Sequence, residues 1–379
     1  MYFVHPQIKL NSQNLKNLFF SFLKSPEERE IEKLKVAFPQ KELIFTDMGR
    51  TAFKLIVEKL GLQNSQILLP AYICDIFFPI FKEYKLSPIF LDIERETFQM
   101  NLDLIEKKIT KKTRAILICH TYGLPVNIKK IETLAKKYNL KIIEDCAHSF
   151  GSGTGNSGDA SLFSLYKQFP SLRGGMAIIR KQKTENRNQK SLAKTSFNLR
   201  DFISLLNSFN FFAFLFKKFG GKIAPKMIRS EKSKKISQVN KVSLNLFLYF
   251  SKNFKEEIKK RIELAIFFQE KLKKLGFEVQ NPKNNVFCYL SALVPKNMDR
   301  DEFVERLRKY GIFCTRIWKD PIILNPEVQK EYNLNLTEFP NTIEVAKRIV
   351  NFPLQNFYIK NDIEKMILAI KKCLSSNDK

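Results

Sequence analysis

The chain has 379 residues, a hydrophobic content of 44% and a formal net charge of +27 at pH 7. This length accommodates a large domain and a smaller one, and the apolar content excludes a disordered chain. Lysine is spread over nearly every segment without a helix-turn-helix, zinc-finger or RNP-like pattern, so we interpret the charge as compositional bias and expect no nucleic-acid binding.

The six cysteines lack CxxC spacing, and several of them stand in apolar runs. This usage favours reduced, buried thiols over a disulfide framework or a metal cluster. The first residues of the chain lack a basic segment followed by a long apolar core, as a secretion signal would have. We therefore expect a cytoplasmic protein.

The N-terminal forty residues carry an apolar patch at 18–23 and a charged helix over 26–35. We expect this segment to pack across the body of the protein or across a partner subunit. It carries no residues that indicate chemistry.

A strand over 43–46 then leads through Gly49 into an amphipathic helix over 53–60. A strand, a glycine and a helix start offer free backbone N–H groups to an anion. One interpretation places a phosphate on Gly49, Arg50 and Thr51, and the other is an ordinary loop with a threonine cap.

Strand-like and helical segments alternate from residue 66 to residue 145. Strands are predicted over 67–70, 88–92, 115–120 and 141–145, and helices near 75–84, 102–110 and 128–138. This βα alternation predicts an α/β fold with a mainly parallel sheet flanked by helices, and it places ligands at the carboxyl ends of the strands.

Two of these strand ends carry the residues that indicate chemistry. The strand over 141–145 ends in Asp145, and a second strand over 159–166 gives way to a loop at Lys167. Adjacent parallel strands would bring both side chains to one crevice. The pair suits pyridoxal phosphate, because a lysine amine binds its aldehyde and a carboxylate keeps its ring nitrogen protonated.

The order and spacing of several motifs resemble those of the DegT/DnrJ/EryC1/StrS sugar aminotransferases, and the resemblance covers most of the chain. The matching motifs are Gly49-Arg50-Thr51-Ala52, Leu69-Pro70-Ala71-Tyr72, His120-Thr121-Tyr122-Gly123, Glu144-Asp145-Cys146-Ala147-His148, Gly158-Asp159, Phe163-Ser164-Leu165-Tyr166-Lys167, Gly174-Gly175 and Asn351-Phe352-Pro353-Leu354. One such motif is weak, whereas the ordered set is specific.

The resemblance implies a fold-type I enzyme that uses pyridoxal 5′-phosphate to convert a keto sugar, expected to be nucleotide-linked, into an amino sugar. Glutamate is the implied amino donor, a homodimer the implied assembly, and no metal is needed. By resemblance Lys167 carries the cofactor, Asp145 holds its ring nitrogen, His148 its ring hydroxyl and Ser164 its phosphate. A lysine at position 167 also argues against the dehydratase branch of the family, which has histidine there.

Two positions depart from the family pattern. Two fewer residues separate Ser164 from Lys167 than in many members, and Cys74 stands where an aromatic residue stacks on the cofactor ring. Tyr72, His120 and Tyr122 are the three candidates to replace that aromatic ring.

We predict a large cofactor-binding domain over 1–243, with a helical insertion near 196–235, and a small α+β domain over 244–379. Residues 181–194 are polar and basic, which predicts a surface connection. In the small domain we expect helices over 254–275, 300–310 and 362–373, and strands over 277–280, 285–294 and 313–318.

The run 202–216 lacks charged residues and is followed by a basic segment. It is too short and too polar to cross a bilayer. The alternatives are a helix pair packed on a partner subunit and an interfacial helix over 202–229, at the inner membrane surface.

A family member without turnover, which acts as a binding or regulatory protein, is the further alternative to an enzyme.

Overall fold

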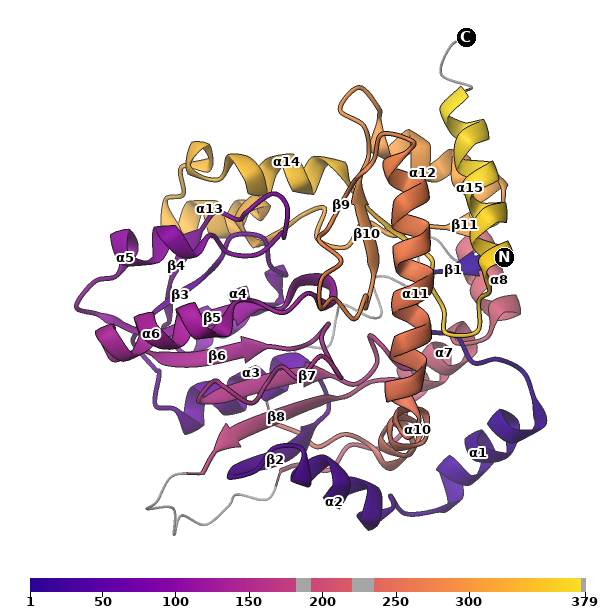
Figure 1. Cartoon of the computed structure of the whole chain (residues 1–379). Helices are drawn as coiled ribbons and strands as arrows, with labels where there is room; N and C mark the ends of the chain where they lie inside the picture. The colour runs from indigo at the N-terminus through magenta and orange to yellow at the C-terminus, as the bar shows by residue number, and fades with distance from the viewer. Residues whose placement is uncertain (182–191, 220–234, 376–379) are drawn as a thin grey trace.

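The computed structural model describes residues 1–181, 192–219 and 235–375. Its centre is a seven-stranded sheet (Figure 1). The strands are β2 (Lys41–Thr46), β3 (Gln66–Pro70), β4 (Ser87–Leu91), β5 (Thr113–Cys119), β6 (Lys141–Asp145), β7 (Ala160–Ser164) and β8 (Gly175–Arg180). Their order is β2-β8-β7-β6-β5-β3-β4, and the five from β7 to β4 are parallel, while β8 runs antiparallel to both its neighbours. The predicted mainly parallel sheet is confirmed.

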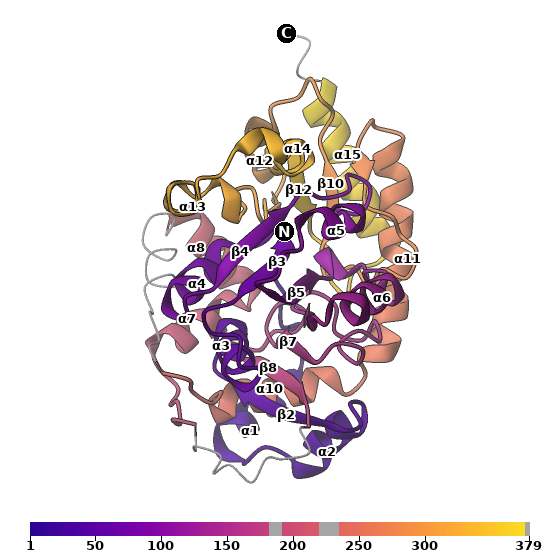
Figure 2. The same cartoon turned by 90° about the vertical axis from the view of Figure 1, so that its left-hand side faces the viewer.

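Both faces of this sheet are buried, because alternate residues of each strand point to opposite sides. On β3, Ile67 and Leu69 join an apolar cluster with α3 (Gly49–Lys59) and α4 (Phe78–Glu83). Leu68 points the other way and joins a cluster with α5 (Ile105–Lys108) and α6 (Ile128–Tyr138). Figure 2 shows the two sets of helices on opposite sides of the sheet. This double covering explains the near-continuous apolar runs of the strands.

The C-terminal part of the chain forms a smaller antiparallel sheet covered by helices. The strands β12 (Ile349–Phe352), β10 (Leu290–Leu293) and β9 (Glu278–Val279) pair in that order. The helices α11 (Phe254–Lys273), α12 (Arg300–Lys309) and α15 (Lys360–Ser375) share one apolar cluster with them. On α15, Ile363, Met366 and Ile370 are buried, as their helical spacing predicts. In the sequence, α13 (Pro326–Tyr332) and α14 (Pro340–Arg348) come between α12 and β12, and Val328 of α13 joins the apolar cluster of the large sheet.

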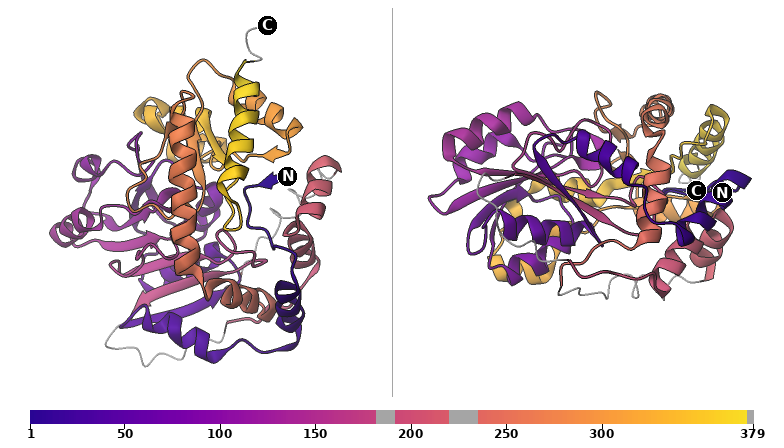
Figure 3. Two further views of the ribbon diagram at one scale, coloured as in Figure 1. Left: turned by 45° about the vertical axis from the view of Figure 1, so that its right-hand side comes forward. Right: turned by 90° about the horizontal axis from the view of Figure 1, so that it is seen from below.

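The N-terminus joins this smaller part, because β1 (Tyr2–Phe3) pairs in parallel with β11 (Ile312–Phe313). Further along, α1 (Ser12–Leu23) packs on α10 (Lys241–Ser251), and α2 (Glu28–Val36) follows it. The helices α7 (Leu199–Asn207) and α8 (Asn210–Phe219) lie on the same side of the molecule as α1 (Figure 3). The N-terminal segment therefore packs across the body, as expected. The other expectation, that this segment packs on a partner subunit, stays a prediction.

Two predicted strands are longer than the observed ones. The strand expected over 285–294 is limited to β10, and the strand expected over 313–318 ends at Phe313. Residues 182–191, in the predicted surface connection, and residues 220–234 of the predicted insertion lie outside the described residues. The division at residue 243 stays a prediction.

Among the described residues, no single helix is long and apolar enough to cross a membrane. The helices α7 and α8 meet that requirement only when they are taken together, and they are bent by 110° with respect to each other. None of the six cysteines, all of which lie in the described part of the chain, forms a disulfide, and five of them are buried.

Candidate active site

The carboxyl ends of β6 and β7 bring Asp145 and Lys167 together. The two strands are adjacent and parallel, Asp145 is the last residue of β6, and Lys167 follows the end of β7 by three residues. Burial lowers the pKa of Lys167, but the acidic groups around it, Asp145 among them, outweigh burial and raise that pKa. The structure thus places the two side chains close enough for their charges to interact, and their roles stay predictions.

The Asp145 carboxyl lies in a dry position. It is 4% exposed, accepts a hydrogen bond from the Ala147 N–H at 3.0 Å, and has the Cys119 thiol 3.9 Å from Oδ2. Burial raises the pKa of Asp145, although the charge of Lys167 and the Ala147 N–H lower it. A carboxylate in such surroundings interacts strongly with any cation placed beside it.

The imidazole of His148 contacts the amine of Lys167, with Nε2 and Nζ 3.0 Å apart. The Tyr122 backbone N–H donates to Nδ1 of the same ring at 3.3 Å. Burial, with the charge of Lys167, holds the pKa of His148 well below its usual range, so the ring is neutral. Because a backbone N–H only donates, Nδ1 accepts and the ring proton is on Nε2, and the ammonium of Lys167 has no acceptor for that proton.

A second group of residues surrounds the start of α3. This helix begins at Gly49 without a side-chain cap, so Gly49, Arg50 and Thr51 form its first turn. Gly175 is required here, because a Cβ on it would lie only 2.4 Å from the Met48 backbone. Opposite Gly175 on β7, Ser164 has a buried Oγ with no hydrogen-bond partner in the part of the chain that the structure describes.

This arrangement fits a bound anion. A buried hydroxyl that finds no partner in the protein costs free energy, and a ligand oxygen would satisfy it. The first turn of α3 adds the positive end of a helix to the same place. The structure thus brings Ser164 and the Gly49 turn together, as the phosphate interpretation requires.

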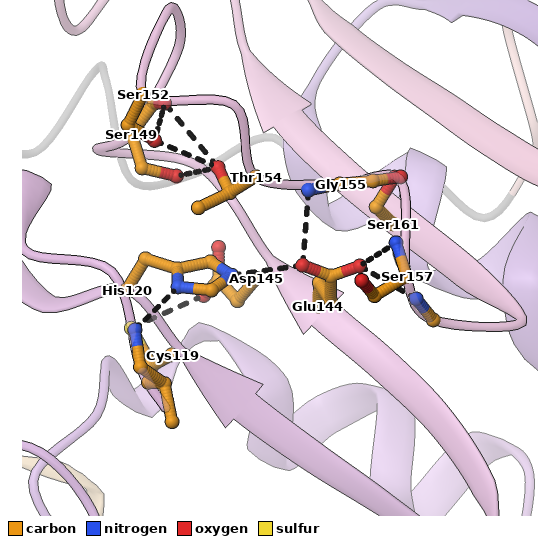
Figure 4. Close-up of polar contacts among 12 residues, drawn as sticks. Cys119, His120, Glu144, Asp145, Ser149, Ser152, Thr154, Gly155, Ser157 and Ser161 are labelled. Atoms are coloured by element: carbon orange, nitrogen blue, oxygen red, sulfur yellow. Dashed lines mark hydrogen bonds and ion pairs between the residues drawn. The ribbon is translucent and has the colours of Figure 1, made fainter. Parts of the chain in front are cut away.

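His120, one of the three candidates for ring stacking, belongs to a separate hydrogen-bond network around Glu144. Its Nε2 lies 3.1 Å from Glu144 Oε2, and its Nδ1 accepts the Val126 N–H at 3.0 Å. Figure 4 shows the Glu144 carboxylate in contact with His120 and accepting hydrogen bonds from backbone N–H groups of the loop that follows β6. Burial alone would raise the pKa of Glu144. The hydrogen bonds, that of His120 first, outweigh burial and lower this pKa from 4.5 to about 2. Glu144 and Asp145 are successive residues of β6 and point to opposite faces, so His120 binds on the face opposite the Asp145 carboxyl.

The remaining two candidates, Tyr72 and Tyr122, are buried and joined to each other by their hydroxyls at 2.7 Å. The Tyr122 ring lies nearly parallel to the His148 ring, with centroids 5.7 Å apart. The charges of Lys167 and Asp145 both influence the pKa of the Cys74 thiol, which burial raises. Cys74 therefore lies at the site, as its position in the sequence predicts.

Two site residues were missed by the sequence analysis. The Cys288 Sγ lies 3.9 Å from the Lys167 carbonyl oxygen, and the Trp318 ring lies 5.0 Å from the His148 ring. Neither stands in a motif, and both come from the C-terminal part of the chain. The only signal for Trp318 in the sequence was that it is the single tryptophan of the chain.

Comparisons with known proteins agree with this geometry. The chain is 26% identical over 364 residues to dTDP-4-amino-4,6-dideoxy-D-glucose transaminase of Shigella dysenteriae, which covers 92% of this chain and 90% of the relative. It is 39% identical over 140 residues to GDP-perosamine synthase of Escherichia coli O157:H7, 34% of this chain and 38% of the relative.

A solved structure has the same fold. The Escherichia coli GDP-4-keto-6-deoxy-D-mannose-3-dehydratase with bound hydrated PLP superposes with a TM-score of 0.75 at 17% identity, over 98% of this chain and 100% of that chain. The sequence profile of one family matches residues 45–212 and 233–371. The predicted family, fold class and enzyme class are confirmed: the chain belongs to the DegT/DnrJ/EryC1/StrS aminotransferase family.

Proposed function

We propose that this aminotransferase uses pyridoxal 5′-phosphate to convert a nucleotide-linked keto sugar into an amino sugar, with glutamate as amino donor. The observation that carries the proposal is the placement of Lys167 beside Asp145 and His148 at the ends of adjacent parallel strands. The names of the relatives, a dTDP-sugar transaminase and a GDP-perosamine synthase, support the substrate class. The bound PLP in the dehydratase of the same fold supports the cofactor.

The residues present fit the cofactor at both of its ends. Ser164, whose buried Oγ lacks a partner among the described residues, and the first turn of α3 would hold the phosphate. Lys167 would hold the aldehyde carbon covalently, and His148 Nε2–H would donate to the ring hydroxyl oxygen. When bound, pyridoxal phosphate supplies an electron-withdrawing ring that stabilises negative charge on the substrate carbon.

Asp145 would stabilise the protonated ring nitrogen. Raising the pKa of that nitrogen by about two units requires roughly 2.7 kcal/mol. One close carboxylate in a site from which water is excluded supplies an energy of this size, since the effective dielectric constant there is low. The burial of Asp145 is therefore part of its function.

Lys167 would act a second time as the group that moves a proton. As a free amine next to the reacting carbon, Nζ would accept a proton from one carbon atom and return it to another. Lys167 is half-buried, which limits the exchange of this proton with solvent.

Borohydride reduction followed by peptide mass spectrometry tests the proposal. We expect a yellow protein that loses its colour on reduction, with a pyridoxyl group fixed on the peptide that contains Lys167. The Lys167→Ala variant should lose both the adduct and transamination, because it removes the covalent attachment and the proton-transfer group together. An adduct on another lysine would contradict this assignment.

The alternative without turnover predicts a different result. A binding or regulatory protein would give no reducible adduct on any lysine and no amino sugar from any nucleotide-linked keto sugar. Cys74 in place of an aromatic residue is the one feature that favours this alternative. The joint presence of Lys167 and Asp145 favours the enzyme.

We further propose that the protein is a cytoplasmic homodimer. Apolar side chains on α1 and on the α7–α8 pair are highly exposed in the single chain: Phe19 is 62%, Leu23 61% and Phe211 62% exposed. A monomer would leave this surface to water, whereas a partner subunit would bury it. Light scattering at micromolar concentration should give twice the mass of the chain, and a stable monomer loaded with cofactor would contradict the dimer.

A membrane surface is the competing occupant of the α7–α8 surface. Exposed phenylalanines beside basic residues also suit an interface with anionic lipid at the inner membrane surface. Flotation with vesicles that contain phosphatidylserine separates the two possibilities. We expect the dimer to stay unbound, and co-flotation that is lost in a Phe211→Glu variant would favour the membrane interpretation over 202–229.

A further inference from the structure

The single tryptophan of the chain lies at the candidate active site, in a group of aromatic rings. Trp318 packs against His148 with ring centroids 5.0 Å apart, against Tyr122 at 5.5 Å and against Tyr72 at 5.5 Å. His148 in turn contacts Lys167. One ring therefore separates the indole from the amine of Lys167.

The backbone at Trp318 has an unusual conformation. Its φ is +60°, in the left-handed region, and Tyr122, which contacts it, has a φ of +58°. Bulky side chains adopt this region rarely, because it is sterically strained, and such residues concentrate at functional sites. Here two of them stack on each other next to Lys167, so the two outliers support one interpretation.

Several hydrogen bonds fix the backbone next to the indole, at Ile317. The Tyr122 hydroxyl donates to the Ile317 carbonyl at 2.6 Å, and the Ile317 N–H donates to Asn351 Oδ1 at 2.7 Å. Asn351 is itself fixed by its bond to Ser291 Oγ at 2.8 Å. The surroundings of Trp318 thus determine its orientation before any ligand binds.

The indole differs from its neighbours in one respect. Tyr72, Tyr122 and His148 are all buried, whereas Trp318 keeps part of its surface exposed. Cys74, where the family has an aromatic residue, carries no ring. Trp318 is therefore an aromatic surface next to the Lys167 region that remains accessible to a ligand.

We propose that Trp318 determines substrate specificity by packing its indole against the sugar ring of the nucleotide-linked substrate. The inference rests on the proposed function. The C–H groups on one face of a hexose carry partial positive charge, and the face of an indole carries partial negative charge, so the two attract each other. Truncating an aromatic ring that makes such a contact weakens binding by roughly 10- to 100-fold.

The tryptophan itself provides the first test, because all tryptophan emission of the protein comes from this position. The cofactor-loaded protein is titrated with dTDP-4-amino-4,6-dideoxy-D-glucose and with GDP-perosamine, and in parallel with dTDP and GDP. We expect a saturable change of emission with the sugar nucleotide that the enzyme turns over, and none with the bare nucleotides. An equal change with a bare nucleotide, or no change with a sugar that is turned over, would overturn the proposal.

Kinetics of variants provides the second test. Trp318→Ala should raise KM for the sugar nucleotide by about tenfold or more while KM for glutamate stays unchanged, and Trp318→Phe should stay within about threefold of wild type. Tyr310→Ala serves as the matched control, because this aromatic residue is 47% exposed at the end of α12. An unchanged KM in Trp318→Ala would contradict the proposal.

A failure of the proposed function is recognised separately. The reduced pyridoxyl adduct on Lys167 does not depend on the sugar, so Trp318→Ala should still form it. Loss of the adduct from the wild-type protein would reject the cofactor assignment. An intact adduct with an unchanged KM would reject only the role of Trp318.

Discussion

Removing the Asp201 carboxylate should destabilise the loop that carries Lys167. Arg173 lies between Lys167 and β8, and its Nε donates to Asp201 Oδ1 at 2.6 Å, with the side chains 4% and 1% exposed. Asp201 also caps the first turn of α7 with Asn198 and accepts from Asn240 at 3.1 Å. This network joins the Lys167 segment to the helices that follow β8.

The expected loss is large because the pair is buried. Breaking a buried ion pair by removing one partner costs about 3–5 kcal/mol, since the other charge stays in a dry environment. We therefore expect Asp201→Ala to lose about 3 kcal/mol or more in urea unfolding. The matched control is Glu32→Ala, which breaks the Glu32–Lys35 pair of similar length, 2.6 Å, on the surface, where side chains are 55% and 44% exposed. It should lose no more than about 0.5 kcal/mol.

A double variant distinguishes the charge effect from a simple loss of packing. Replacing both partners with apolar residues of similar volume, Arg173→Met with Asp201→Leu, removes the unpaired charge and should recover much of the stability. A loss below about 1 kcal/mol in Asp201→Ala would refute the reasoning. So would a double variant that is no more stable than the single one.

Three further variants test the site residues. Asp145→Asn should keep the cofactor but lower the transamination rate by about 100-fold, the equivalent of the roughly 2.7 kcal/mol assigned to the ring nitrogen, measured by single-turnover kinetics. Ser164→Ala removes a buried hydroxyl that lacks a partner among the described residues, so the cofactor-free protein should lose no stability while cofactor affinity falls about tenfold in equilibrium titration. Glu144, with a folded-state pKa of about 2 against an ordinary 4.5, contributes stability that is present above pH 4.5 and is lost as the pH falls toward 2. Glu144→Gln should therefore abolish this acid-dependent part of the urea midpoint, and an unchanged pH profile would contradict it.

The sequence predicted the parts of the site that depend on local pattern. The strand that ends at Asp145 is short and centred on two buried isoleucines, and a helix starts at Gly49, so a strand end and a helix start follow from periodicity and composition alone. Because strands β6 and β7 are parallel neighbours, their ends had to meet. The position of Lys167 beside Asp145 was therefore accessible to reasoning from the chain.

The position of Trp318 was not accessible in this way. Residues 313–318 are rich in β-branched and aromatic residues, which predicts a strand, but β11 ends at Phe313. The residues that pair with this segment are far away in the sequence. β11 pairs with β1 at the N-terminus, and Thr315 forms an isolated bridge with Asn351. Contacts of this range override local propensity, and periodicity carries no signal for them.

The aromatic group also explains how the His148 ring is oriented. A neutral imidazole carries its proton on one nitrogen, and the Tyr122 N–H donates to Nδ1, which leaves the proton on Nε2. The Tyr122 ring stacks on the His148 ring, while Trp318 stacks on Tyr122 and contacts the His148 ring at a tilt of 38°. These rings therefore hold Nε2 on the side that faces Lys167, where Nε2–H is available to a ligand oxygen.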